Sequence, residues 1–144
     1  MPEDAASVRA LVERALAGTR YLVRTTEQLD AALAFEDPEF LAVLAERDDD
    51  IVALALFGAV AGARQCTRFH ALVGADGDAL DALATGVAQV CADAGERLVV
   101  AELPDDALFT AACSALRAAG FREDGRIDDY VADGVGLLLL VWRP

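Results

Sequence analysis

His70 and Glu102 are the two side chains in this sequence best suited to move a proton. His70 is the only histidine of the chain, and an ordinary imidazole titrates close to neutral pH, where it can act as a general base. Glu102 stands at the end of an apolar stretch that predicts a strand, and the carboxyl ends of strands often carry functional side chains. The alternative for His70 is a partly buried ring that makes one structural hydrogen bond.

A loop of small and acidic residues follows the strand that carries His70. Residues 74–79 read Gly-Ala-Asp-Gly-Asp-Ala and precede a predicted helix. The unpaired N–H groups and the dipole of a helix N-terminus favour anions such as phosphate. Asp76 and Asp78 oppose that function, because each can cap the helix with its own carboxylate and each repels phosphate. The loop is therefore either a half-kept phosphate site or a plain capped helix start.

No metal site is expected. Cys66, Cys91 and Cys113 form no Cys-x-x-Cys pair, and the aspartates of residues 76–81 lack the spacing of a calcium loop. We expect the three cysteines to be reduced and buried, as in a cytoplasmic protein. The opening residues show no charged segment followed by an apolar core, so a secretory signal is not expected either.

The net charge of the chain restricts the classes of partner that it can bind. The formal net charge is −13, and all twelve basic residues are arginines. This balance argues against nucleic acid and against anionic membrane surfaces, which both need a basic face. Two readings of the acidity remain, a surface that resists association or a field that attracts a cationic substrate such as an amine. The longest uncharged apolar run, residues 51–63, is too short to span a membrane.

The periodicity of apolar residues predicts one α/β domain over residues 1–144. Helices are expected at 1–17, at 26–35 with Thr25 as the capping residue, at 78–93 and at 105–119. Strands are expected at 39–46, 51–60, 67–73, 97–103, 122–127 and 137–142. Residues 67–103 then form a parallel strand–helix–strand crossover. The order predicts a central mixed sheet flanked by about four helices.

The last quarter of the chain has a distinctive order of short motifs. It holds Gly120-Phe121 after a small-residue helix, Asp129-Tyr130 after an extended segment, an Asp133-Gly134 turn and the apolar stretch 137–142. This order resembles the C-terminal half of the GCN5-related N-acetyltransferase (GNAT) superfamily. The resemblance implies the GNAT-like acyl-CoA N-acyltransferase fold over most of the chain. The family's first strand usually precedes its first helix, and here we expect that strand to be missing or very short.

The resemblance also implies an activity, the transfer of acetyl from acetyl-CoA to an amine of a small molecule or peptide. His70 or Glu102 would be the general base. The cofactor-binding positions that the resemblance implies are Ala71, Leu72 and Val73 along the pantetheine arm, with Gly74, Gly77 and Ala79 near the pyrophosphate. The partners expected are thus a small amine or peptide substrate and a second copy of the chain in a homodimer.

Three positions depart from the family pattern. Gly74 stands where the family has Arg or Gln, Leu116 where it has the tyrosine that protonates the leaving thiolate, and Phe109 on or near its asparagine. These departures leave open an alternative, a non-catalytic GNAT-fold protein that binds another ligand or acts as a dimeric interaction module. The apolar stretch 137–142 has two readings as well, an edge that pairs in a dimer or an interior strand covered by helices.

Overall fold

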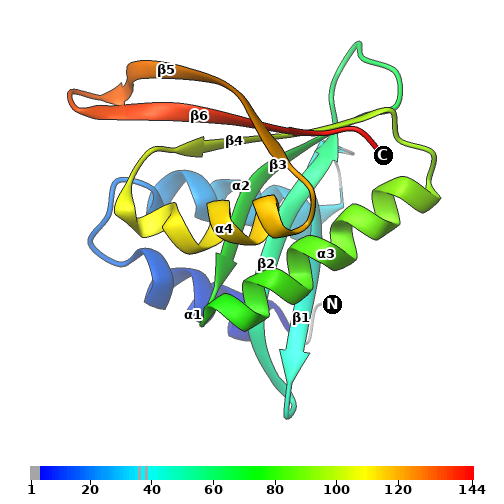
Figure 1. Cartoon of the computed structure of the whole chain (residues 1–144). Helices are drawn as coiled ribbons and strands as arrows, with labels where there is room; N and C mark the ends of the chain where they lie inside the picture. Colours follow the sequence, from blue (N-terminus) through cyan, green and yellow to red (C-terminus); the bar gives the residue numbers. More distant parts are fainter. Residues whose placement is uncertain (1–3, 36, 38) are drawn as a thin grey trace.

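The computed structural model describes residues 4–35, 37 and 39–144. Within them a six-stranded sheet carries helices on both faces (Figure 1), which confirms the mixed sheet and the helices expected from the sequence. The elements follow in the order α1 (Ala5–Leu16), α2 (Leu22–Ala34), β1 (Leu41–Arg47), β2 (Asp50–Ala59), β3 (Cys66–Gly74), α3 (Gly77–Asp93), β4 (Leu98–Pro104), the 3₁₀ turn η2 (Ala107–Phe109), α4 (Thr110–Ala118), β5 (Arg122–Ala132) and β6 (Val135–Trp142).

The sheet has the strand order β1-β2-β3-β4-β6-β5. Only β3 and β4 are parallel, and α3 connects them, so the predicted crossover is confirmed. The other neighbouring strands are antiparallel. Strand β6 lies between β4 and β5, and therefore the apolar stretch 137–142 is an interior strand. Its alternative reading as an exposed edge is wrong, because β5 takes that position.

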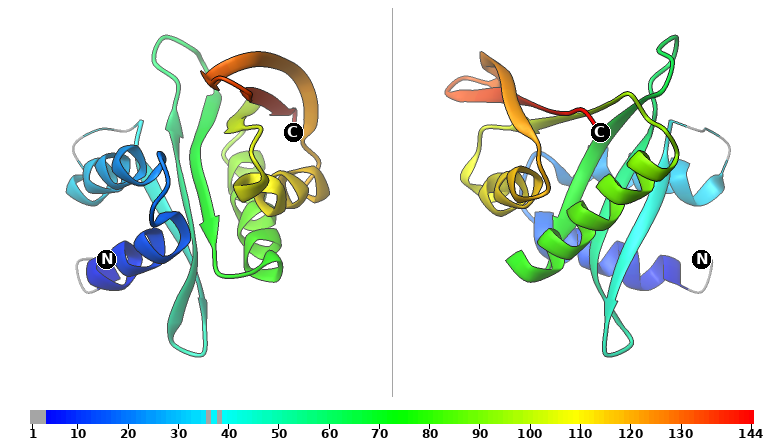
Figure 2. Two further views of the ribbon diagram at one scale, coloured as in Figure 1. Left: turned by 90° about the vertical axis from the view of Figure 1, so that its left-hand side faces the viewer. Right: turned by 45° about the vertical axis from the view of Figure 1, so that its right-hand side comes forward.

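Two hydrophobic cores lie on the two faces of the sheet. Helices α1 and α2 cover one face, and α3 and α4 cover the other (Figure 2). Leu11 and Leu29 pack with Leu54 of β2 in the first core, whereas Phe69, Leu116 and residues of α3 share the second. Because a strand directs successive side chains to opposite faces, β2 and β3 contribute to both.

A β-bulge interrupts the alternation of β3. Leu56 of β2 pairs with Ala71, but the next residue, Phe57, pairs with Phe69, so His70 is the extra residue on β3. Phe69 and Leu72 consequently belong to the core under α3 and α4, while Ala71 belongs to the core under α1 and α2. A bulge of this kind bends the strand and increases its twist.

Two helix boundaries differ from the prediction. Helix α2 begins at Leu22 rather than Thr26, and Thr25 is buried inside it with its N–H bonded to the carbonyl of Tyr21. The predicted helix over 105–119 is divided into η2 and α4, since Asp106 caps η2 through the N–H of Leu108. Helix α1 is the first element of the described residues. Residues 1–3, part of the predicted first helix, lie outside them.

Candidate functional site

Strands β3 and β4 separate at the bulge. Their parallel ladder ends at the pair Phe69–Ala101, and the next two residues along the strands are His70 and Glu102. Figure 1 shows the two strands leaving a shared end of the sheet in diverging directions. Beyond Phe69 the side of β3 that faced β4 has no strand partner among the described residues. The opening between the strands is occupied by cavities rather than by a third strand.

The larger cavity, about 430 Å³, lies on the side of α2. Its walls come from α2, β3, β4 and the hairpin of β5 and β6. The ionisable side chains on those walls are Arg20, Tyr21, Arg24, Arg68, His70, Glu102 and Tyr130. His70 and Glu102, the two proton-transfer candidates, are thus brought to one cavity.

His70 makes a structural hydrogen bond, which was one of the two roles that its sequence position left open. Its Nε2 lies 2.8 Å from the carbonyl oxygen of Glu39, and because a carbonyl only accepts, Nε2 is the protonated nitrogen and Nδ1 keeps its lone pair. Burial lowers the pKa of His70, and the positive charges of Arg68 and Arg24 lower it further, although the hydrogen bond to the Glu39 carbonyl and the negative charge of Glu39 oppose them. The ring is therefore held in one tautomer and favours the neutral form that a general base requires.

Arg68 lies beside Glu102 but does not form a close pair with it. The Arg68 Nη2 to Glu102 Oε1 distance is 3.9 Å, and both side chains are partly exposed, so the ion pair is weak. The Nε atom of Arg68 is buried without a hydrogen-bond partner. A buried donor without an acceptor is uncommon and costly.

The smaller cavity, about 220 Å³, is lined by the end of α1, the end of β3, the start of α3, η2 and α4. Of the predicted cofactor-binding residues, Leu72, Val73, Gly74 and Gly77 line it. Ala71 and again Val73 line the larger cavity. Ala79 is buried and lines neither, but its N–H points at the carboxylate of Asp76.

The N-terminus of α3 already holds an anion, the side chain of Asp76. Asp76 Oδ1 accepts from the Ala79 N–H at 2.9 Å, and Arg47 reaches both carboxylate oxygens at 2.7 and 3.2 Å. Arg47, foremost, and the Ala79 N–H hold the pKa of Asp76 at about 2. The predicted capping role of Asp76 is confirmed, and its carboxylate occupies the helix N-terminus that the sequence left open as a phosphate site.

Two family positions are apolar in the structure as well. Leu116 is fully buried in the core under α3 and α4. Phe109 is buried where the two cavities meet, and lines both. Neither side chain can donate a proton to a leaving thiolate.

A polar contact that the sequence did not indicate crosses this junction. The Tyr21 hydroxyl donates to Asp106 Oδ2 at 3.0 Å, and the Tyr21 ring packs edge-on against Phe109 with centroids 4.8 Å apart. Burial, with help from Asp106, raises the pKa of Tyr21. A sequence signal for this wall of the larger cavity was the spacing of Arg24 and Gln28, which lie one helical turn apart on α2.

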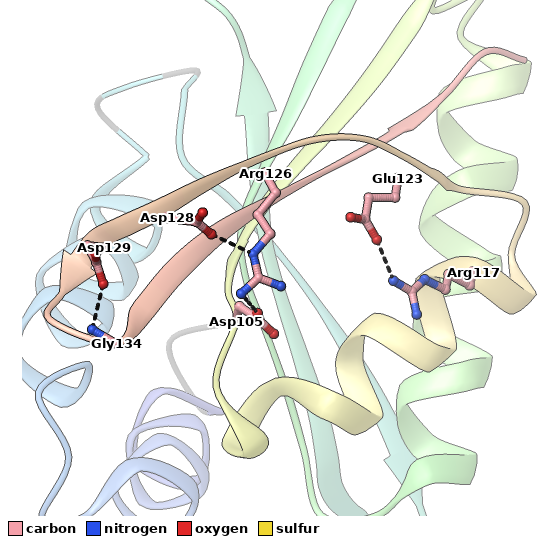
Figure 3. Close-up of polar contacts among 7 residues, drawn as sticks. All are labelled: Asp105, Arg117, Glu123, Arg126, Asp128, Asp129 and Gly134. Carbon is pink, nitrogen blue, oxygen red and sulfur yellow. Dashed lines mark hydrogen bonds and ion pairs between the residues drawn. The ribbon is translucent and has the colours of Figure 1, made fainter.

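The hairpin of β5 and β6 forms the remaining wall and is tied by charges. Figure 3 shows Arg126 of β5 bridging Asp105 and Asp128, while Arg117 of α4 contacts Glu123. At the turn, Asp129 Oδ1 accepts from the Gly134 N–H at 2.7 Å. These contacts hold the hairpin that presents Tyr130 to the larger cavity.

Cys66, Cys91 and Cys113 are buried and free, as predicted. No group of three or more His, Cys, Asp or Glu residues is placed to hold a metal ion within the described part of the chain. Over those same residues, no helix has the length and apolar character needed to cross a membrane.

Comparisons with known proteins identify the fold. The chain superposes with a TM-score of 0.81 and 22% identity on a Desulfovibrio desulfuricans protein attributed to the GNAT family of acetyltransferases, over 99% of this chain and 94% of that one. A ribosomal-protein-alanine N-acetyltransferase from Brucella melitensis matches at TM-score 0.75 and 17% identity, over 100% and 96% of the two chains. A Salmonella typhimurium protein solved with its cofactor acetyl-CoA matches at 0.77 and 15%, over 99% and 90%.

The sequence itself matches no family model and no curated protein. The chain therefore has the GNAT fold in a divergent sequence, which confirms the fold that the C-terminal motifs implied.

Proposed function

We propose that this protein transfers an acetyl group from acetyl-CoA to an amine held in the larger cavity. The observation that carries the proposal is the separation of β3 from β4 at His70, which leaves a strand edge without a partner and a cavity on either side of it. One neighbour of the same fold is named as an N-acetyltransferase, and another, named as an acetyltransferase, was solved with acetyl-CoA. Both support the choice of reaction.

The fit of acetyl-CoA is good along the strand and poor at the phosphates. The open edge of β3 from Ala71 to Gly74 offers backbone groups to the amides of a pantetheine arm, in the manner of an added strand. At the start of α3, however, Asp76 and Arg47 already form an ion pair. Phosphate binding near Gly77 would have to displace or adjoin a carboxylate.

The chain's own residues supply the remaining steps. His70 Nδ1 would accept the proton of the attacking amine, directly or through one water. Glu102 would hold the protonated amine beforehand by its negative charge. Backbone N–H groups at the bulge would stabilise the oxyanion that forms when the amine adds to the thioester carbonyl. With Leu116 buried at the family's acid position, the leaving thiolate would take its proton from solvent.

The alternative is a protein of the same fold that binds a ligand in the larger cavity without acyl transfer. The Asp76–Arg47 pair and the buried Leu116 favour it, because both remove groups that acetyl-CoA chemistry would use. In either case the free, buried cysteines support a reducing, cytoplasmic location. A homodimer would most simply use the exposed edge strand β5, where Ile127 and Tyr130 are exposed.

A calorimetric titration with acetyl-CoA, followed by a free-thiol assay with a panel of amines, tests the proposal. Saturable binding in the micromolar range and amine-dependent thiol release are the expected results. Folded protein that takes up no acetyl-CoA at millimolar concentration contradicts acyl transfer and leaves the ligand-binding alternative. Size-exclusion chromatography with light scattering decides between monomer and dimer.

A further inference from the structure

The larger cavity has a charge opposite to that of the whole chain. Three of the twelve arginines, Arg20, Arg24 and Arg68, line it, and Glu102 is the carboxylate in the same lining. The chain as a whole carries a formal charge of −13. A local excess of guanidinium groups favours a positive potential at this cavity, and its members Arg20 and Arg24 are exposed to solvent.

None of these guanidinium groups forms a close ion pair with a carboxylate of the described residues, although the charge of Arg20 acts on nearby Asp106. Within the described residues, Arg20 and Arg24 form no ion pair, in contrast to Arg9, which pairs with Asp30 outside the cavity. Arg68 has only the 3.9 Å contact to Glu102, and its buried Nε has no acceptor. That Nε has almost no exposed surface, so a ligand would meet the partly exposed remainder of the Arg68 side chain rather than this atom.

Neighbouring carboxylates do not fill this role. Asp106 borders the cavity through Tyr21, but both of its oxygens are engaged, Oδ1 by the Leu108 N–H and Oδ2 by the Tyr21 hydroxyl. The negative charge of Glu39 also acts on His70, but among the described residues its carboxylate forms no ion pair with Arg24 or Arg68, and its backbone carbonyl is bonded to His70. The positive charges of both Arg68 and Arg24 lower the pKa of His70, which indicates that the two guanidiniums act on the same space around the imidazole.

We infer that the amine bound in this cavity also carries an anionic group, a carboxylate or a phosphate, which Arg24 and Arg68 hold while the amine lies toward His70 and Glu102. Arginine recognises both anions through paired N–H donors. A cavity of about 430 Å³ suits a small molecule of the amino-acid class rather than a folded partner. The inference rests on the proposed function only in treating the bound amine as an acetyl acceptor.

The test uses matched ligands and omits acetyl-CoA. Calorimetry compares L-phenylalanine with L-phenylalaninamide, and O-phosphoethanolamine with ethanolamine, on the full chain. The first pair reports a carboxylate and the second a phosphate. We expect at least one anionic member to bind on the order of tenfold more tightly than its neutral partner. The pair with the larger affinity ratio identifies the anion that the cavity prefers.

The same titrations on Arg24→Gln and Arg68→Gln locate the effect. Each substitution is expected to remove most of the preference for the anion, whereas Arg68→Lys should restore part of it through charge alone. Arg64→Gln is the matched control, because Arg64 is exposed in the turn between β2 and β3 and does not line the cavity. Circular dichroism confirms that each variant is folded.

The outcomes separate this inference from the proposed function. Anion preference that depends on Arg24 and Arg68, without any acetyl-CoA binding, supports the inference and rejects acyl transfer. Equal binding of acids and amides, preference that survives both substitutions, or no binding of any probe at millimolar concentration overturns it. Acetylation of neutral amines alone would leave acyl transfer intact and reject the anionic acceptor.

Discussion

The opening between β3 and β4, called the cleft below, has two ends, which are the start of α3 and the larger cavity. These two ends differ in how their charged groups are paired. At the start of α3, the Asp76 carboxylate accepts from the Ala79 N–H and from Arg47, so the positive groups there are satisfied from within the chain. In the larger cavity, Arg24 forms no ion pair with the described residues and the buried Nε of Arg68 has no acceptor. One end pairs its cation closely with its own anion, whereas at the other, among the described residues, Arg24 is unpaired and Arg68 has only the long contact to Glu102.

This difference shows that the net charge of a chain does not predict the local charge of its functional site. A formal charge of −13 suggests attraction of a cation, yet the cavity that carries His70 is rich in arginine. Potentials are set by the groups that line a site, and a surface of the opposite sign changes them little across solvent. Five expected outcomes test the contrast between the two ends.

The largest effect is expected at the arginine-rich end, from His70→Gln. Removing the general base should lower the acetyl-transfer rate on the order of a hundredfold, while acetyl-CoA affinity stays unchanged. Steady-state kinetics with a fixed amine measure both quantities. Glu102→Gln is the companion variant and should raise KM for the amine more than it lowers kcat. An unchanged rate for His70→Gln would assign the base to another group.

The next effect concerns the start of α3, where Asp76→Asn should improve acetyl-CoA binding. The asparagine still caps the helix, but the negative charge is gone and Arg47 is free to meet a phosphate. We expect an affinity gain on the order of tenfold in calorimetry. Asp78→Asn is the control, because it removes the same charge from the same helix turn but leaves the Asp76–Arg47 pair in place. Equal affinity gains for both variants would mean that the gain comes from reduced charge repulsion and not from the release of Arg47.

The Asp76–Arg47 pair should also resist mild acid. Arg47, chiefly, lowers the pKa of Asp76 from 3.8 to about 2, so its stabilising contribution is complete above the unfolded value. That contribution is lost only as the pH falls toward about 2. The affinity difference between Asp76→Asn and the wild type is therefore expected to persist at pH 5.

A smaller effect is expected at the junction of the two ends, from Tyr21→Phe. Loss of the hydroxyl donor to Asp106 should reduce the free energy of unfolding by about 1 kcal/mol or less, the net value of one partly exposed hydrogen bond. Urea denaturation followed by circular dichroism measures it. Tyr130→Phe is the control, because that hydroxyl has no hydrogen bond to a described residue and the side chain is 63% exposed. A cost as large for Tyr130→Phe would contradict the assignment.

The smallest effect is the pH dependence of stability that His70 contributes. Burial and the nearby arginines lower its pKa below 6.5 in the folded state, so the unfolded chain binds the proton more readily. Stability should therefore decline as the pH falls from above 6.5 through the folded pKa. Unfolding free energies measured across that interval should vary less in His70→Gln. An identical slope in both proteins would contradict the shift.

Most of the fold could be predicted from periodicity. The limits of β3 and α3 fall within one residue of the expected ones, because buried strands and a capped amphipathic helix have clear patterns. The start of α2 was placed four residues late, at Thr26, because Thr25 and Gln28 have the residue types and the three-residue spacing of a capping box. The buried face that includes Leu29 in fact begins one turn earlier, and packing against the sheet decides where the helix starts.

The site was harder to predict than the fold. His70 and Glu102 could be named from their strands, and the capping by Asp76 from its place before a helix. The partner of Asp76, Arg47, is 29 residues away, and Arg68 is far from Arg24 in the sequence. Those contacts arise only when the strands are paired and α2 is packed, so no local pattern contains them.

The cleft depends on the number of residues in β3, because the bulge at His70 decides which face of the sheet each later side chain of the strand meets. Because one extra backbone unit shifts β3 by half of its two-residue repeat, the strand leaves the bulge in the opposite phase. Any side chain at position 70 preserves this shift, whereas deletion of the residue would restore the phase and exchange the faces of Leu72 and Val73. The opening between the strands should therefore persist when the imidazole is replaced, and a lineage could lose the chemistry of this cleft while keeping the space in which it would occur.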